Sequence, residues 1–118
     1  MTALTVTFEQ FDVVVVPFPF TDRAQNKRRP ALVISKQAFN LAAEHSVMAM
    51  ITSATENAWP LDTKISNLKA AGLPAASVVR MKLFTLDHRF VLRKAGRLNK
   101  ADEKAVLTAL NELFPAAL

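Results

Sequence analysis

The sequence predicts a mainly β protein, a small, strongly bent antiparallel barrel with helices attached. Several short runs of β-branched and apolar residues are separated by turn-forming residues, which is typical of small barrels. The chain then closes on one amphipathic segment, which indicates a helix packed on the sheet. Its 118 residues, 51% of them hydrophobic, predict a single domain over 1–118 with one core.

The first two strands are expected near the N-terminus. Residues 12–16 form a β-branched run that predicts a buried strand. Pro17 and Pro19 cannot donate ladder hydrogen bonds, so residues 17–20 should leave the sheet or lie at its edge. Residues 21–29 are expected to form a polar loop, and Pro30 to open a second strand over 31–34.

The middle of the chain predicts one short helix and one strand. Residues 36–44 carry apolar side chains at helical spacing, and residues 47–52 form a third strand. Alternation along that strand places Met48, Met50 and Thr52 on one face. Breakers in 53–76 predict mainly loop, with one short strand at most.

The C-terminal part predicts two consecutive strands and the clearest helix. The strands cover 77–85 and 90–95, with Arg80 and Lys82 on one face of the first. Asn99 is the expected cap of the helix, which Pro115 stops. Two acids fall in its first turn, and its apolar stripe comprises Val106, Leu110, Leu113 and Phe114.

Several function classes are excluded by composition. The chain has no cysteine, which excludes a disulfide framework, a thiolate zinc site and a cysteine nucleophile. Neither His45 nor His88 stands at a recognised metal-ligand spacing, so we expect no metal and no other cofactor, with His88 exposed in a polar turn. No apolar run approaches the length that spans a bilayer, and no signal-peptide pattern is visible. We therefore expect a cytoplasmic protein with no membrane partner.

The charge distribution is uneven. The formal net charge is +5, and the sequence pI is about 10.0. Most basic residues lie in two segments, residues 23–36 and residues 80–100. If these segments meet in space they form one positive face, which is typical of nucleic-acid binders but is also found on soluble domains with a cationic side.

Two strand ends carry the candidate chemistry. Lys27, Arg28 and Arg29 precede Pro30, and adjacent side chains of an extended segment point in opposite directions. One of the two arginines should therefore face the site, where its planar fork matches phosphate oxygens. Thr52 and Ser53 place hydroxyls at the end of the third strand, so guanidinium and hydroxyl form a plausible anion-stabilising pair. Trp59 is expected either to stack on a base or to cover an edge of the core.

Several segments resemble the MazF/PemK toxin family. Residues 11–22, with their proline–phenylalanine run, and residues 27–35, with the arginine–proline junction, closely resemble the opening of that family. Residues 51–53, 77–87 and 96–98 are similar to its later strands, so the resemblance spans about 11–114. One departure is Phe11, where the family usually has glycine, and this should affect the local turn more than the site.

The resemblance implies the toxin of a type II toxin–antitoxin pair, with an SH3-like barrel of PemK/CcdB type that is usually a homodimer. It implies a metal-independent, sequence-selective endoribonuclease acting on single-stranded RNA, mainly mRNA, with Arg29 and Thr52 at the catalytic positions. An acidic antitoxin tail would cover the same groove. The residues expected to bind RNA are Lys27, Arg28, Ser53, Arg80, Lys82, Phe20 and Trp59.

Two other functions remain as alternatives. A CcdB-like gyrase poison would act through its C-terminal helix, but residues 113–118 form an apolar tail without polar recognition residues. A basic RNA-binding barrel without catalysis explains the charges equally well. It does not explain why Thr52 should stand opposite Arg29.

Overall fold

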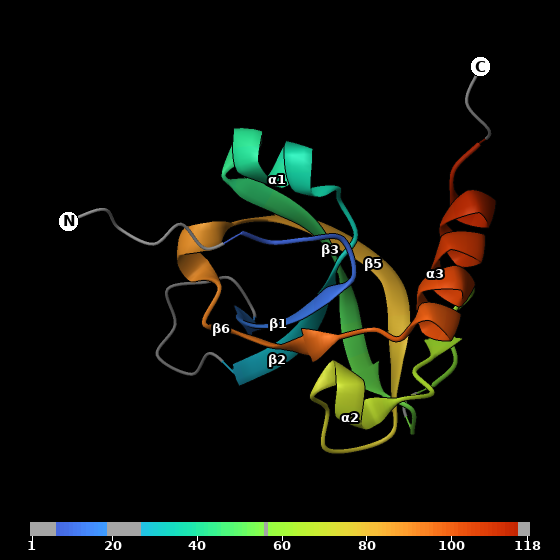
Figure 1. The fold of residues 1–118 in the computed structure, drawn as a ribbon. Coiled ribbons are helices and arrows are strands. Elements are labelled where there is room, and N and C mark those ends of the chain that lie inside the picture. The colour runs from blue at the N-terminus through green and yellow to red at the C-terminus, as the bar shows by residue number, and fades with distance from the viewer. Residues whose placement is uncertain (1–6, 19–26, 56, 116–118) are drawn as a thin grey trace.

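The computed structural model describes residues 7–18, 27–55 and 57–115, which form one curled antiparallel sheet with helices around it (Figure 1). The sheet order is β4-β5-β3-β2-β1-β6. The strands are β1 Asp12–Phe18, β2 Lys27–Val33, β3 His45–Ser53, β4 Thr63–Lys64, β5 Ser77–Asp87 and β6 Arg93–Arg97. The helices are α1 Gln37–Ala43, α2 Leu68–Ala71 and α3 Lys100–Leu113, with a 3₁₀ turn, η1, at His88–Phe90.

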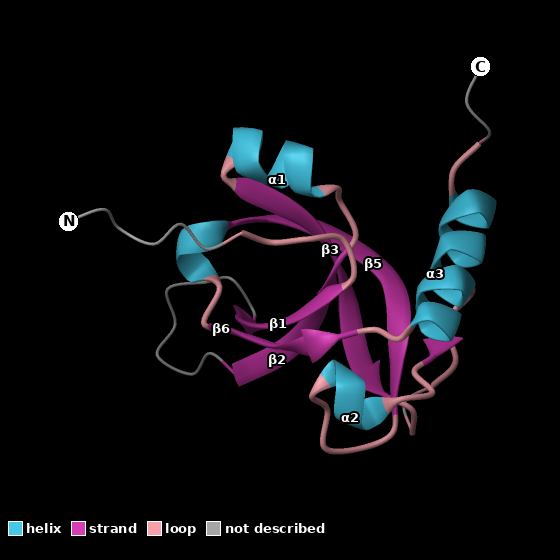
Figure 2. Ribbon diagram, viewed as in Figure 1, coloured by secondary structure: helices cyan, strands magenta, loops and turns pink. Residues whose placement is uncertain are grey.

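This architecture confirms the predicted fold, because the sheet curls into a half-barrel and the helices lie outside the strands (Figure 2). Alternating residues of the strands build two cores. The inner core includes Val13, Leu32, Ile51 and Val79 and packs against Val106 of α3. The opposite face carries a second core of Phe8, Val14, Val16, Ala31, Val33, Met48 and Leu86. No helix of the described residues is long and apolar enough to cross a membrane.

The second strand begins earlier than expected. Lys27, Arg28 and Arg29 were assigned to a loop, but they belong to β2 and pair with Phe18, Pro17 and Val16 of β1. The prolines still limit pairing as predicted. β6 pairs only with residues up to Val15, before Pro17 is reached, and β3 pairs with β2 only from Ala31, after Pro30.

Two expectations for the C-terminal half are wrong. The stretch 53–76 contains the predicted short strand, β4, but also helix α2, which is only four residues long and is capped by the Asn67 side chain accepting from the Ala70 N–H. The last strand begins at Arg93 rather than at residue 90, and it pairs with β1 instead of continuing beside β5. Turn η1 carries the chain between the two edges of the sheet.

The two glycines of the chain allow α2 to lie against β6. Gly72 ends α2 with φ 72°, a conformation that favours glycine. A Cβ at Gly96 would lie 2.3 Å from the Ala70 carbonyl oxygen. Both positions therefore require glycine for the close approach of the two backbones.

Helix α3 follows the prediction at its start and departs from it at its end. Asn99 caps it by accepting from the Asp102 N–H at 2.8 Å. Val106 is buried, but Leu113 and Phe114 are 39% and 53% exposed and do not pack on the sheet. The apolar stripe thus ends about one turn earlier than expected.

Phe11 adopts the backbone conformation that glycine would favour. Its φ is 76°, and its side chain is buried in the inner core. Its N–H donates to the Val33 carbonyl at 2.7 Å and its carbonyl accepts from the Leu98 N–H at 3.1 Å. Burial of the ring and these two hydrogen bonds hold the turn despite the cost of positive φ.

Candidate nucleic-acid interface

A small groove lies on the sheet face that carries the second core. Its volume is about 250 Å³, and it is lined by Phe18, Met50, Thr52, Arg80, Lys82, Leu83 and Phe84. These residues come from β1, β3 and β5, so the curl of the sheet forms the groove. The structure thus brings together three residues predicted from sequence, namely Thr52, Arg80 and Lys82.

Strand register places Arg29 on the same face as Thr52. Ala31 of β2 pairs with Met50 of β3, and Arg29 and Thr52 each lie two residues beyond these partners, toward the same end of the sheet. Directly paired residues share a face, as do residues two apart on a strand. Arg29 is exposed, and no described residue forms an ion pair or hydrogen bond with its side chain. Among the described residues, its guanidinium is therefore unengaged on the face that carries the groove.

The neighbouring candidates divide between the two faces. Alternation along β2 places Lys27 with Arg29 and Arg28 on the opposite face, as predicted for adjacent arginines. Ser53 likewise alternates with Thr52, and its hydroxyl lies 2.8 Å from that of Thr55. Phe20 lies outside the described residues.

Arg80 is held by protein groups within the groove. Its Nε and Nη2 donate to the two carboxylate oxygens of Asp62 at 3.1 and 2.9 Å, and Nη2 also donates to the Asn57 carbonyl at 2.7 Å. The Arg80 guanidinium lowers the pKa of Asp62, mainly through its side-chain hydrogen bond. A phosphate would have to compete with this carboxylate, so Arg80 contributes less free positive charge than Lys82.

Trp59 stands at the rim of the groove. It is 42% exposed, which disfavours a role as cover of a core edge. The Lys82 ammonium lies 4.5 Å from the centre of its ring, and the Arg80 guanidinium lies 6.0 Å away. Trp59 therefore presents an aromatic surface beside a cation.

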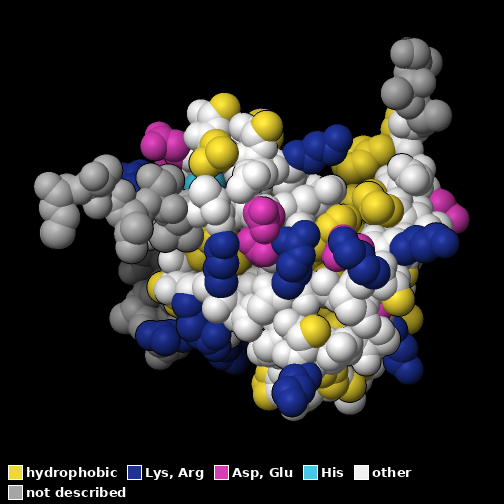
Figure 3. Space-filling model, viewed as in Figure 1, with side chains coloured by type: hydrophobic (Ala, Val, Ile, Leu, Met, Phe, Trp, Pro, Cys, Tyr) yellow, Lys and Arg dark blue, Asp and Glu magenta, His cyan; other side chains and the backbone are white. Residues whose placement is uncertain are grey.

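Carboxylates neutralise much of the second basic segment. Lys94 and Arg97 pair with Asp12 at 3.4 and 3.1 Å, and Arg89 pairs with Asp87 at 2.9 Å. Figure 3 shows the consequence on one face, where a band of basic side chains has acidic side chains among them. No described residue forms an ion pair with Lys27, Arg28, Arg29 or Lys82, and the same holds for five cations elsewhere on the surface, namely Lys36, Lys64, Lys69, Arg93 and Lys104.

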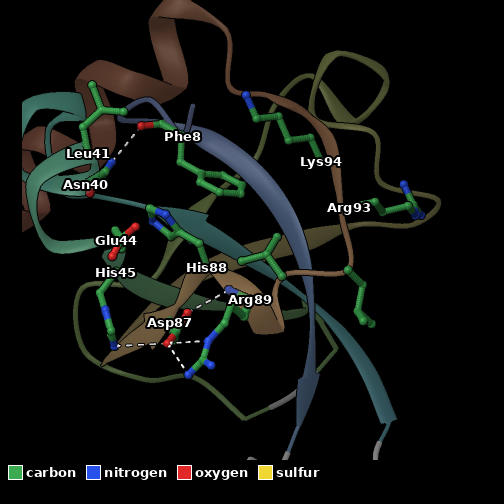
Figure 4. A pocket seen from close by; sticks show the side chains of 12 residues that line it. Phe8, Asn40, Leu41, Glu44, His45, Asp87, His88, Arg89, Arg93 and Lys94 are labelled. Atoms are coloured by element: carbon green, nitrogen blue, oxygen red, sulfur yellow. Dashed lines mark hydrogen bonds and ion pairs between the residues drawn. The ribbon is translucent and has the colours of Figure 1, made fainter. Parts of the chain in front are cut away.

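The larger hollow of the described residues lies elsewhere. It has a volume of about 830 Å³ and lies between α1 and the start of β6 (Figure 4). Of its two acids, Asp87 accepts from Arg89 and lies 3.9 Å from the His45 ring, whereas Glu44 is exposed. Size alone does not make it the site, because Thr52 and Lys82 line the smaller groove and Arg29 lies on the same face of the sheet.

His88 lines this larger hollow and is not the exposed turn residue predicted from sequence. Its Nε2 lies 2.7 Å from the buried Ser46 hydroxyl, and its ring lies against Phe8 with 4.4 Å between ring centres. Burial lowers the pKa of His88. His45 begins β3 and Thr52 lies seven residues further along the strand, which corresponds to about 20 Å.

Sequence reasoning missed some of the groove. Phe18, Met50 and Phe84 contribute its apolar lining, and Asp62 holds its arginine. Alternation had already placed Met50 on the face of Thr52, although not as a groove residue, and alternation from Lys82 could have found Phe84. No local signal identifies Asp62, because its partner lies eighteen residues away.

A curled antiparallel sheet with basic side chains beside a groove on one face defines a small basic half-barrel protein. The family model described as "PemK-like, MazF-like toxin of type II toxin-antitoxin system" matches residues 9–114. The chain therefore belongs to the MazF/PemK toxin family of type II toxin–antitoxin systems. Comparison with curated proteins finds no match.

Solved structures of similar fold include proteins from Deinococcus radiodurans and from mycobacteria. A MazE–MazF structure (Form-II) from Deinococcus radiodurans has a TM-score of 0.73 at 18% identity and covers 96% of this chain and 100% of its own. Mycobacterium tuberculosis toxin MazF-mt6 has a TM-score of 0.71 at 19% identity, and the match covers 91% of this chain and 99% of that toxin. An endoribonuclease in complex with its cognate antitoxin from Mycobacterial species has a TM-score of 0.72 at 16% identity and covers 96% and 100%. At these identities the structures support the fold alone.

Proposed function

We propose that this chain is a sequence-selective, metal-independent endoribonuclease that cleaves single-stranded RNA, mainly mRNA, and thereby inhibits growth. The observation that carries the proposal is the register of β2 and β3, which puts Thr52 of the groove on the same face as Arg29, an arginine whose side chain forms no ion pair with any described residue. Membership of the toxin family supports the same assignment.

The reaction that suits these groups is attack of a ribose 2′-hydroxyl on the adjacent phosphorus. A bond forms between O2′ and phosphorus, and the bond from phosphorus to O5′ breaks. The 2′-hydroxyl gives up its proton, and the leaving oxygen gains one. The products are a 2′,3′-cyclic phosphate and a 5′-hydroxyl, so water is not consumed in this step.

Arg29 and Thr52 act on the charge that develops during this reaction. Negative charge grows on the non-bridging phosphoryl oxygens, and preorganised donors lower the barrier by meeting it. Arg29 supplies two parallel N–H groups, and Thr52 donates one further hydrogen bond that orients the phosphate. A guanidinium is a poor general base near neutral pH, so the role of Arg29 is electrostatic. Without a nearby histidine we expect a slow enzyme.

The cations beside the groove also account for the two proposed partners, RNA and an antitoxin. Lys27 and Lys82 hold backbone phosphates, and an acidic antitoxin tail blocks RNA by occupying these cations. The proposal includes a homodimer, since Phe39, Leu41, Phe90 and Leu92 are each about half exposed. The solved complex of an endoribonuclease with its cognate antitoxin is consistent with such a partner.

The proposal is tested by inducing the chain in bacteria with and without the gene that precedes it, and by mapping RNA 5′ ends. We expect growth arrest and new 5′-hydroxyl ends at one shared short motif, with both relieved by the neighbour. Purified protein should yield the same products in the presence of a chelator. RNA that is bound but never cut would favour the non-catalytic barrel, and intact RNA with broken DNA would favour gyrase poisoning.

Lys27→Ala should weaken RNA binding by a similar factor for every sequence and make it less sensitive to salt. Loss of one phosphate contact lowers the slope of log affinity against log salt by about 0.7 for single strands. Lys104→Ala on α3 is the matched control, because it removes the same charge from an exposed site away from the groove. Binding isotherms at several salt concentrations measure the affinity and its salt dependence for both variants. A loss at Lys27 that depends on base sequence contradicts the assignment.

A further inference from the structure

The loop that carries Trp59 is fixed although its ring is exposed. The Trp59 N–H donates to Asp62 Oδ2 at 3.0 Å, and the Asp62 N–H donates to the Trp59 carbonyl at 3.2 Å. Asp62 also accepts two hydrogen bonds from Arg80, and Arg80 donates to the Asn57 carbonyl. One guanidinium on β5 thus ties down the backbone on both sides of Trp59.

This anchorage is well shielded from solvent. The Arg80 and Asp62 side chains are 11% and 18% exposed, so their ion pair is screened far less than a surface pair. Trp59 itself is 42% exposed, so a largely shielded ion pair holds a turn whose aromatic side chain remains accessible. A rigid aromatic surface at a groove rim is what an unpaired base requires for stacking.

The cation beside the ring fits the same ligand. Lys82 lines the groove and lies 4.5 Å from the centre of the Trp59 ring. A nucleotide whose base lies on Trp59 would therefore place its phosphate near Lys82, with Thr52 in the same groove. Single-stranded RNA combines a planar base and a phosphate at this spacing.

We propose that Trp59 is a base-stacking platform of the groove, and that Asp62 is the positioning residue that makes it selective for the base bound there. The inference rests on the proposed RNA cleavage for its biological meaning, but base binding can be measured without cleavage. Asp62 touches no substrate and acts through the Trp59 turn.

Trp59 is the only tryptophan in the sequence, so intrinsic fluorescence reports on this side chain alone. The probes are short 2′-O-methyl oligoadenylate and oligouridylate, which cannot be cut by 2′-hydroxyl attack, and an abasic ribose-phosphate strand of equal length. We expect the base-containing strands to quench Trp59 fluorescence and the abasic strand to leave it unchanged. Trp59→Ala should lower affinity for the base-containing strands about tenfold or more, and affinity for the abasic strand little.

The Asp62→Asn variant distinguishes the effect of Asp62 on the position of Trp59 from the effect of its negative charge on binding. Removing a carboxylate beside the groove raises the net positive charge, so electrostatics alone would tighten binding of every strand. If Asp62 positions Trp59, the variant should instead bind base-containing strands several-fold more weakly. Its preference between adenine and uracil should also change. Glu112→Gln is the matched control, since it removes one carboxylate from an exposed position on α3. It should change neither the affinity for base-containing strands nor the preference between adenine and uracil. Asp62→Asn should add no further loss in Trp59→Ala protein.

The outcomes separate this inference from the proposed function. If base-containing strands quench Trp59 fluorescence but no RNA is cut in any assay, the proposed nuclease activity is wrong and the stacking platform is supported. If RNA is cut normally but no strand changes Trp59 fluorescence, the stacking platform is wrong and the nuclease activity is supported. Fluorescence that changes with protein concentration alone would assign Trp59 to self-association and overturn the inference. If Asp62→Asn fails to fold, Asp62→Glu retains the charge and tests the same geometry through the base preference.

Discussion

Replacing Arg29 with alanine is expected to lower the rate of RNA cleavage about 10²–10³-fold while leaving the fold intact, because removing one donor to a developing oxyanion has an effect of this size. Arg29 is exposed, so its loss removes no ion pair or side-chain hydrogen bond among the described residues. The measurement is single-turnover cleavage of a mapped RNA at saturating protein, which separates the chemical step from binding. Arg29→Lys should recover only part of the rate, since an ammonium lacks the planar fork.

Arg28→Ala is the matched control for this experiment. It removes the same charge from the adjacent residue, whose side chain alternates to the other face of β2. We expect a modest loss of affinity and an unchanged rate at saturation. Equal losses of rate in the two variants would mean that net charge, and not the position of one guanidinium, drives cleavage.

Thr52 was predictable as a groove residue because its placement depends on local rules. The β-branched run over 12–16 and the period of two along 47–52 determine which side chains share a face, and both strands formed as expected. Arg29 needed one correction, since it belongs to β2 rather than to a loop. That correction strengthens the geometry, because a strand residue has a fixed face and a loop residue does not.

The features that sequence could not supply depend on contacts between distant segments. Helix α2 is too short to be stable by propensity, and it forms because Asn67 caps it and Gly72 lets it lie against β6. Strand β6 pairs with β1 although the short spacing after β5 favoured adjacency. The pairing of Arg80 with Asp62, which changes the expected role of Arg80, likewise joins positions eighteen residues apart.

Asp102→Ala is expected to destabilise the protein by about 3 kcal/mol, far more than its place in a first helical turn implies. From sequence, Asp102 interacts with the helix dipole, an effect of about 0.5 kcal/mol. In the fold it is 4% exposed and accepts from the Ser66 N–H and hydroxyl at 2.9 and 2.8 Å and from the Asn67 N–H at 3.3 Å. Truncation leaves these donors without their partner, at about 1–3 kcal/mol for each donor left unsatisfied.

Glu103→Ala isolates the dipole contribution, because Glu103 lies in the same turn and makes only an i,i+3 pair with Lys100 at 3.7 Å. It should cost about 0.5 kcal/mol, because the Lys100 side chain is 93% exposed and water screens its pair with Glu103. Urea unfolding of both variants measures the difference. Asp102 joins α3 to the segment between β4 and α2 and does not line the groove, so the folded Asp102→Ala protein should cut RNA at the unchanged rate when assayed well below its unfolding temperature. Similar unfolding free energies for the two variants would show that the buried carboxylate does not anchor α3, and that burial of Val106 and Ala109 holds the helix alone.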